Sequence, residues 1–268
     1  VRDESSDTDS VDEEKEGEET EKVIWEGKNM GVVRCVSINV NGMTSRSQRE
    51  DMWERVQTNN IDIVMFIDHG LREKESKSVM IQQHRQMGGT EERQAEWVWS
   101  YGSASSRGEE TRHRLRGGIC VCVRGNLGKH ITKRIVDPTG LSRFVGFIMQ
   151  GKGGVRGLWM TVYRAGEDTQ HGSLFQKQVR YWQSVGETRG PTDMFYYDIL
   201  QIVVSKFASK YIFAGKGGSV WIMGDWNCVD FNGVRGFPTV TNTKRRRYKE
   251  LQKWKEEARV SNMVAKCN

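Results

Sequence analysis

Several apolar stretches of this chain end on a side chain that could do chemistry. These side chains are Asn39 in SINVNG, Asp68 in VMFIDHG, Tyr163 in WMTVYR, and Asp225 with Asn227 in VWIMGDWN. Carboxylate and amide oxygens are the ligands that hard divalent cations such as Mg²⁺ prefer, and a phenol beside them can bond a phosphate oxygen or move a proton. In an extended chain Asp225 and Asn227 project on the same side. Any one of these residues alone is more often the cap of a turn, but the five taken together weaken that interpretation and favour a site.

The elements that would position the first two residues follow a strand, helix, strand order. VVRCVSINV (32–40) has branched residues on both faces, which is typical of an inner strand of a packed sheet, and IDIVMFID (61–68) is a second buried strand. The intervening SQREDMWERVQTNN predicts a helix. Ser47 and Glu50 have capping-box spacing, and Met52 and Val56 lie on one face.

The rest of the chain continues the mixed pattern. Residues 72–96 are polar and predicted to begin as a helix, EWVWSYG predicts a short strand, and residues 103–118 a charged loop. ICVCV, SRFVGFIMQ and LWMTVY predict three strands of an antiparallel meander, and LFQKQVRYW a helix with Phe175, Val179 and Trp182 at helical spacing. DMFYYDILQIVVSKFASKY predicts a longer apolar helix, VWIMGDWN a strand, and RRRYKELQKWKEEAR a final helix. This order fits a mixed sheet or sandwich flanked by helices.

Composition and charge limit the class of protein. The 268 residues suffice for a large core, and no apolar run approaches the roughly 20 residues of a membrane span. Residues 1–22 hold eleven Asp or Glu against three Lys or Arg, and they lack the apolar core of a secretory signal. We expect residues 1–28 to form a disordered acidic tail and residues 29–268 to form the folded domain. The remainder is basic, which weakly favours a nucleic-acid partner over a merely solubilising surface.

The five cysteines make no CxxC pair, which argues against a disulfide scaffold or a zinc ribbon and favours a reducing, intracellular setting. Cys120 and Cys122 are predicted to be buried structural thiols. Two basic clusters, of Arg112, Arg114 and Arg116 and of Lys244, Arg245, Arg246 and Arg247, could contact phosphates, although such clusters are more often solvated surface.

The ordered motifs INVNG, DIVMFID, RGGICV, the VY of WMTVYR, and above all GDWN resemble the exonuclease–endonuclease–phosphatase superfamily. Within it, the sequence is most similar to apurinic/apyrimidinic endonucleases and to the endonuclease domains of non-LTR (LINE-type) retrotransposons. The resemblance spans about residues 31 to 265. It implies a four-layered, DNase I-like α/β sandwich, a Mg²⁺ or Mn²⁺ cofactor, DNA as the substrate and a reverse transcriptase further along the same polypeptide. It also implies an intracellular protein that is nuclear if it derives from a retroelement.

The resemblance assigns roles residue by residue. Asn39 and Asp68 would lie at the metal, although the family has a glutamate at the second position and aspartate is one methylene shorter. Tyr163 matches the active-site tyrosine; branches that act on lipids and small phosphates more often have histidine there. Asp225 would orient or deprotonate the attacking water, and Asn227 would help to hold the phosphate. Arg164, where the family often begins an alanine-proline pair, is a difference outside the chemistry.

One departure concerns the end of the family's pattern. The family closes with further strands and a Ser-Asp-His segment whose histidine acts at the phosphate, and no such segment follows GDWN here, so the domain is expected to lack its last strands. His69 is the histidine nearest the site, but a loop histidine is more often solvated or a hydrogen-bond partner. Two alternatives to DNA nicking therefore stay open. One is an inactive or decayed fragment that at most binds nucleic acid, and the other is a phosphodiesterase or phosphatase for a small phosphate ester.

Overall fold

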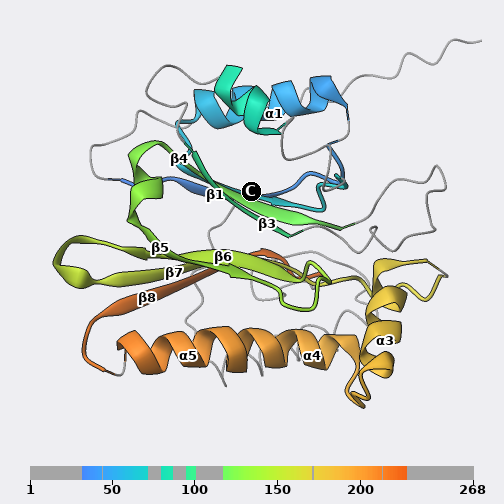
Figure 1. Ribbon diagram of the computed structural model, residues 1–268. Helices are drawn as coiled ribbons and strands as arrows, with labels where there is room; N and C mark the ends of the chain where they lie inside the picture. Colours follow the sequence, from blue (N-terminus) through green and yellow to red (C-terminus); the bar gives the residue numbers. More distant parts are fainter. Residues whose placement is uncertain are drawn as a thin grey trace, which may run out of the picture.

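The computed structural model describes residues 32–43, 45–71, 80–86, 95–100, 117–170, 172–212 and 214–227. Within these residues two β-sheets stack face to face, and a layer of helix covers the outer face of each (Figure 1). The predicted four-layered α/β sandwich is confirmed. Predictions for the acidic tail, for the loop up to Arg116 and for the final helix concern residues outside these ranges.

The first sheet contains β1 (Cys35–Asn39), β2 (Ile63–Ile67), β3 (Ala95–Ser100) and β4 (Ile119–Arg124), in the order β1-β2-β4-β3. β1 and β2 pair in parallel and are joined by α1 (Arg46–Thr58), which confirms the strand, helix, strand opening. Among the described strands β1 lies at the end of the order, so within this part of the chain it pairs with β2 alone. Its branched residues on both faces reflect the two layers that cover it, not two neighbouring strands.

The second sheet contains β5 (Ile131–Val136), β6 (Phe144–Gln150), β7 (Arg156–Tyr163) and β8 (Gly218–Asp225), in chain order. β5, β6 and β7 are antiparallel, whereas β8 is parallel to β7. The predicted meander is therefore wrong in its first strand: ICVCV forms β4 of the other sheet, and β5 takes its place. The short helix η1 (Gly125–His130) connects β4 with β5. β5 escaped the sequence pattern because three successive residues at its centre, 132–134, are exposed.

The helices agree with prediction in position and differ in detail. α1 is capped by Ser45 with Gln48, not by Ser47 with Glu50, although both pairs have the capping-box spacing. α3 (Leu174–Ser184) buries Leu174, Gln178 and Trp182, so only Trp182 of the predicted face is buried. The predicted long apolar helix is one continuous run of α4 (Pro191–Tyr197), η3 (Asp198–Val204), α5 (Ser205–Phe207) and η4 (Ala208–Ile212), in which η3 and η4 have π-helical turns. Residues 80–86 form a further helical turn. No helix in the described ranges is long and apolar enough to cross a membrane.

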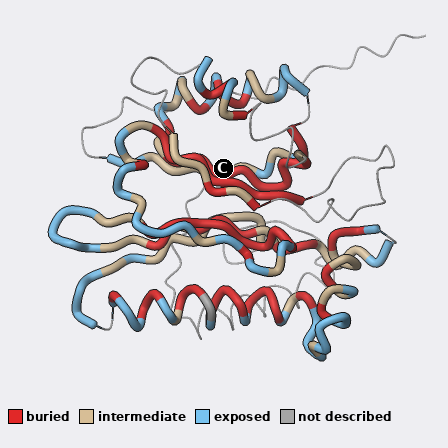
Figure 2. Tube along the Cα trace, in the orientation of Figure 1, coloured by how far each residue is buried: buried red, intermediate tan, exposed pale blue. Residues whose placement is uncertain are grey.

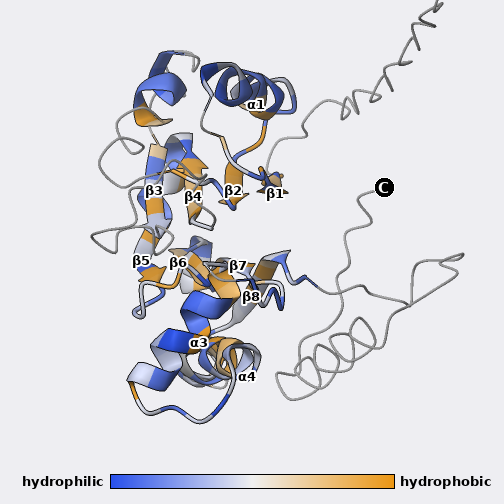
Figure 3. Cartoon of the chain, turned by 90° about the vertical axis from the view of Figure 1, so that its right-hand side faces the viewer, coloured by the Kyte–Doolittle hydropathy of each residue, from blue (hydrophilic) through white to orange (hydrophobic). Residues whose placement is uncertain are grey.

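The core has three main apolar layers, and the strands and helices that contribute to them are largely red, for buried residues, in Figure 2. The first lies between α1 and the first sheet, the second between the two sheets, and the third between the second sheet and the α4–η4 helix. Seen from the side, the two sheets lie parallel between their helices (Figure 3). Cys120 and Cys122 are buried in the first layer as free thiols, as predicted. Burial raises the pKa of both, so they are protonated and unreactive at neutral pH.

His84 gives the fold a pH dependence. Its ring packs edge-on against Trp53, with 5.0 Å between centroids, and its pKa is lowered from 6.5 to about 4, chiefly by burial and secondarily by the charges of Arg124 and Arg85. Between these two pH values the unfolded chain binds a proton that the folded chain does not. The free energy of unfolding should therefore fall as the pH drops from about 6.5 to about 4.

Urea denaturation of the wild type and of His84→Gln at pH 7 and pH 5 tests this expectation. The variant should lose less stability between the two pH values than the wild type. The loss should shrink and not vanish, because burial also lowers the pKa of His69 to about 4. An equal loss in both proteins would contradict the assignment to His84.

Candidate active site

Asn39 and Asp225 come from different sheets and meet at the same end of the sandwich. Asn39 ends β1 and Asp225 ends β8. The Asn39 Nδ2 donates a hydrogen bond of 2.8 Å to Asp225 Oδ2, although the two residues lie 186 positions apart in the chain. Both side chains are accessible, since Asn39 is exposed and Asp225 half-buried. The structure thus brings the predicted metal ligand and the predicted base together at an open rim.

The hydrogen bonds on both sides of this contact fix the orientation of each group. The Asn41 N–H donates to Asn39 Oδ1 over 3.0 Å, which leaves the Asn39 amide nitrogen to face Asp225. The Asn227 N–H donates to Asp225 Oδ1 over 2.8 Å, and Asn227 Nδ2 donates to the Arg164 carbonyl. Asp225 therefore accepts from both neighbours as an ionised carboxylate does.

Tyr163 lies beside Asp225 on the neighbouring strand. It ends β7 and is in register with Asp225 across the parallel β7–β8 pair, so both side chains project from the same face of the sheet. That face is the inner one, where Tyr163 packs at the border of the core between the sheets. Its backbone N–H donates to the Arg143 carbonyl over 2.8 Å. The register confirms that Tyr163 and Asp225 are neighbours.

Asp68 lies at the adjacent strand end of the first sheet. Ile67 is the register partner of Asn39, and Asp68 is the next residue. The Gly42 N–H donates to the Asp68 carbonyl over 2.7 Å, so the turn after β1 runs along Asp68. Asp68 Oδ1 accepts a hydrogen bond from the Gly117 N–H, which ties the carboxylate to the start of β4. Asp68 is buried, in contrast to the exposed Asn39.

Three of the five described non-glycine residues with a positive φ lie in these turns, and the other two, Asn60 and Ser142, lie elsewhere. Asn41, Asp68 and Asn227 have positive φ angles of 45°, 53° and 45°, in a region where non-glycine residues are uncommon. Such conformations persist only where surrounding contacts hold them, and they cluster at functional sites. The three residues lie directly after β1, β2 and β8, which are three of the four strands that carry predicted site residues.

His69 is a buried hydrogen-bond partner next to Asp68, not a solvated side chain. Its ring packs edge-on against Trp99, and its Nδ1 accepts from the Leu71 N–H over 3.1 Å. Burial lowers its pKa to about 4, so the ring is neutral at pH 7. His69 therefore supports the turn after β2 and carries no charge toward a phosphate.

The oxygen atoms of the site suit a hard divalent cation. Among the described residues no group of three or more His, Cys, Asp and Glu side chains could hold a metal ion. Mg²⁺, however, is usually bound by only one or two carboxylates, keeps several waters and takes further oxygens from substrate phosphates. The neighbouring strand ends that carry Asn39 and Asp68 offer one amide and one carboxylate. That donor set fits Mg²⁺ or Mn²⁺ and does not fit a structural zinc.

Some predicted residues lie outside the described ranges, and the sequence analysis set aside one residue that contacts the candidate site. The predicted DNA contacts Arg112, Arg114, Arg116 and Lys244 to Arg247 all fall outside those ranges. Arg164 was set aside as a difference outside the chemistry, yet its backbone contacts both Asp225 and Asn227. In the sequence, only the position of Arg164 directly after Tyr163 indicates that it lies near the site. Its burial could not be predicted, because local sequence pattern does not show whether an arginine is buried.

Gly224 allows the strand that carries Asp225 to lie close to the backbone of its neighbouring strand. Its φ is 148°, and a Cβ at this position would lie 2.1 Å from the Val162 carbonyl oxygen. Gly224→Ala should therefore destabilise the fold by roughly 3 kcal/mol or more, the sum of backbone strain and overpacking. Gly140→Ala is the control: its φ is 71° but nothing lies within 4 Å, so only the strain, about 1–2 kcal/mol, is expected. Thermal denaturation of both variants measures the difference, and equal losses would exclude the clash.

Comparison with known proteins finds similarity in solved structures only. No family model matches the sequence, and no curated protein does. Among solved structures, the AP endonuclease LMAP from Leishmania major is 11% identical with a TM-score of 0.55, over 84% of this chain and 66% of that chain. The 3′ phosphatase NExo from Neisseria is 14% identical with a TM-score of 0.45, over 83% of this chain and 71% of that one. An AP endonuclease from Archaeoglobus fulgidus is 11% identical with a TM-score of 0.44, over 83% and 70%. The chain therefore shares the DNase I-like α/β sandwich fold of the Leishmania enzyme.

Proposed function

We propose that this chain is a divalent-metal-dependent phosphodiesterase that nicks DNA, and that it is the endonuclease domain of a non-LTR retrotransposon polyprotein. The observation that carries the proposal is the Asn39–Asp225 hydrogen bond across the two sheets. This bond joins an amide and a carboxylate at one open rim, beside Tyr163, which is in register with Asp225. A phosphodiester that reaches this rim would meet the Asp225 carboxylate, the Tyr163 phenol, and the side-chain amides of Asn39 and Asn227.

Each residue has a role that its contacts allow. Asp225 holds the attacking water and takes its proton, since each carboxylate oxygen keeps a further lone pair beyond the bond that it accepts. The phenol of Tyr163 donates to a phosphate oxygen and stabilises the charge that develops there. Asn227 fixes the turn and faces the scissile phosphate from the Asp225 side. The metal would be held by Asn39 and Asp68, where its positive charge would neutralise the phosphate.

The substrate class follows from charge and from the tyrosine. Outside residues 1–22 the chain is strongly basic, in a protein whose total charge is +6. Basic surface grips the DNA backbone without regard to sequence, so binding should weaken steeply as salt rises. The Leishmania protein that shares this fold is an AP endonuclease, which supports DNA over a small phosphate ester. A retroelement enzyme would act in the nucleus, and a reverse transcriptase should be encoded in the same reading frame.

Conversion of supercoiled plasmid to the nicked form tests the proposal. The full chain should nick in Mg²⁺ or Mn²⁺ and lose the activity in EDTA. Bis(p-nitrophenyl) phosphate serves as the competing substrate, because a small-ester phosphodiesterase would hydrolyse it and leave the plasmid intact. Plasmid that stays supercoiled in metal would contradict the proposal. The retroelement assignment is tested separately, since a stop codon directly after Asn268 in the genomic sequence would exclude it.

A further inference from the structure

Arg164 is a buried cation next to the proposed site. It follows Tyr163 and is 1% exposed. Burying a charge is costly unless the charge is paired and hydrogen-bonded, so a buried arginine needs partners that outweigh its loss of hydration. The guanidinium of Arg164 has such partners, and the backbone of Arg164 separately contacts the turn that carries Asp225.

The backbone of Arg164 braces both ends of the Asp225–Asn227 turn. The Arg164 N–H donates to the Asp225 carbonyl over 2.9 Å, and the Arg164 carbonyl accepts from Asn227 Nδ2. Asn227 holds a strained φ of 45°, and it is held there by this contact and by the hydrogen bond from its N–H to the Asp225 carboxylate. A shift of Arg164 would therefore move both residues.

The guanidinium of Arg164 is hydrogen-bonded to α4 and to the loop that follows β7. Its Nη2 donates to Glu167 Oε1 over 2.9 Å and to Thr192 Oγ1 over 3.1 Å. Thr192 lies in the first turn of α4, the helix that begins at Pro191. The Glu167 carboxylate is itself only 15% exposed, so the ion pair is largely sheltered from water.

The same helix holds the middle residue of the turn. Trp226 stacks on Tyr196 of α4, with 6.3 Å between centroids and 12° between ring planes, and Phe195 meets it edge-on at 5.9 Å. α4 thus contacts the Asp225–Asn227 turn directly, through Trp226, and indirectly, through Arg164. The turn that carries the acidic group of the site is fixed between strand β7 and helix α4.

The geometry points to Arg164 as a positioning residue that transmits the placement of α4 to Asp225 and Asn227, an inference that rests on the proposed function for its catalytic consequence. Arg164 touches no substrate. Its removal should leave DNA binding intact and slow the chemical step, since supporting residues of this kind typically contribute about 10- to 100-fold to activity.

The test compares Arg164→Met, Arg164→Lys and Thr192→Val with the control Arg124→Met. Arg124 is another buried arginine, bonded to the Ile61 carbonyl at the far end of β4, so its loss should reduce stability without touching the site. Plasmid nicking is measured well below each melting temperature. Arg164→Met should lower kcat about 10- to 100-fold with KM within about twofold, whereas Arg124→Met should leave kcat unchanged. Arg164→Lys keeps the charge for Glu167 and should recover part of the loss. Thr192→Val, the mildest change, should shift kcat in the same direction.

Hydrogen exchange supplies a measurement that does not depend on activity. The Asn227 amide should exchange faster in Arg164→Met than in the wild type and should keep its wild-type rate in Arg124→Met. An unchanged kcat, or unchanged Asn227 exchange, in folded Arg164→Met would overturn the inference. A wild type that binds DNA and never nicks it would instead contradict the proposed function, and the exchange rates would still decide the role of Arg164.

Discussion

Asp225→Asn is expected to lower the rate of plasmid nicking by about 10²- to 10⁴-fold, the usual contribution of a general base. Asparagine has nearly the same size and shape as aspartate. The effect of the substitution therefore reports only the loss of the negative charge and of one hydrogen-bond acceptor. In the wild type both carboxylate oxygens accept, one from Asn39 Nδ2 and the other from the Asn227 N–H. An asparagine has only one acceptor oxygen, and its NH₂ would face a donor. Nicking at the wild-type rate would remove Asp225 from the mechanism.

A swap of the two partners separates chemistry from structure. In Asn39→Asp combined with Asp225→Asn, the amide introduced at position 225 would donate to the carboxylate introduced at position 39 and accept from the Asn227 N–H. That carboxylate would in turn accept from the Asn41 N–H. All the hydrogen bonds of the pair are then restored with the charge moved to the other sheet. The free energy of unfolding should return to within about 0.5 kcal/mol of the wild type, while activity stays low. Activity restored by the swap would show that the position of the carboxylate does not matter.

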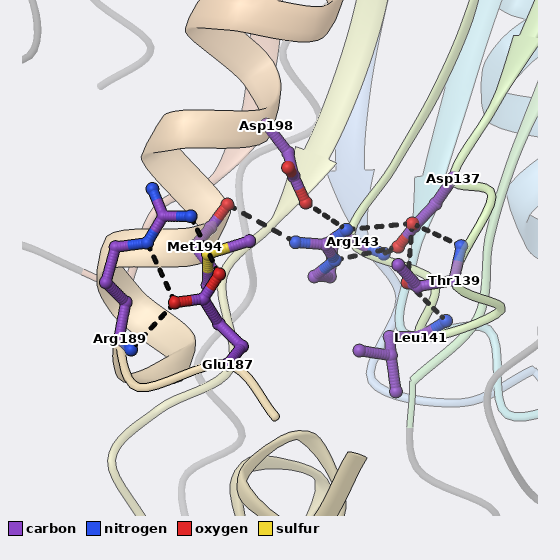
Figure 4. Close-up of polar contacts among 8 residues, drawn as sticks. All are labelled: Asp137, Thr139, Leu141, Arg143, Glu187, Arg189, Met194 and Asp198. Atoms are coloured by element: carbon purple, nitrogen blue, oxygen red, sulfur yellow. Dashed lines mark hydrogen bonds and ion pairs between the residues drawn. The ribbon is translucent and has the colours of Figure 1, made fainter. Parts of the chain in front are cut away.

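Arg143→Met is expected to destabilise the fold by about 3–5 kcal/mol, because it leaves two carboxylates buried without their cation. Arg143 is fully buried between Asp137 and Asp198, as Figure 4 shows. Its Nε and Nη2 donate to the two oxygens of Asp137 over 2.9 Å each, and Nη2 also lies 2.7 Å from Asp198 Oδ2. This cluster joins the β5–β6 turn to the helix that covers the second sheet. Urea denaturation at pH 7 measures the loss.

The pH dependence of the Arg143→Met variant identifies the cause. In the wild type, burial by itself raises the pKa of Asp137, but the hydrogen bonds and the charge of Arg143 outweigh it and hold the pKa below 3.8. That lowered pKa stabilises the fold above pH 3.8 and is lost as the pH falls. Without Arg143 the pKa of Asp137 should rise above 3.8, so the deficit of the variant should shrink toward acidic pH. A deficit that is independent of pH would indicate lost packing instead.

The solvent-accessible pair of half-buried Glu187 and exposed Arg189, also drawn in Figure 4, is the control. Its geometry resembles that of the buried cluster, with Arg189 Nη2 2.7 Å from Glu187 Oε2, but water screens the charges. Glu187→Gln should leave the denaturation midpoint essentially unchanged. A loss of stability as large as that of Arg143→Met would show that the contribution of an ion pair to the stability of this fold does not depend on its burial.

Local sequence pattern was enough to assign most strands and helices and to show which side chains stand at strand ends. Alternation and helical spacing involve only nearby residues, so β1, α1, β2 and β8 were predictable, as was the place of Asp225 and Asn227 after a strand. The shared capping-box spacing could not choose between Ser45 and Ser47, because the choice depends on where the chain enters the helix. The four-layered fold was predictable from the family motifs.

Packing between the layers settled which strands share a sheet and which distant groups meet. β4 pairs with β2 and β3 although β5 and β6 follow it in sequence, since strand pairing depends on contacts between layers and not on local pattern. Arg143 and Arg164 look like surface residues in a sequence, yet both are buried. Arg143 is paired with Asp137 and Asp198, and Arg164 with Glu167 and with Thr192 of α4. The Asn39–Asp225 contact likewise exists because two sheets bring their strand ends to one rim. The residue types at the strand ends identified the candidate site residues, and the stacking of the two sheets brought those residues together.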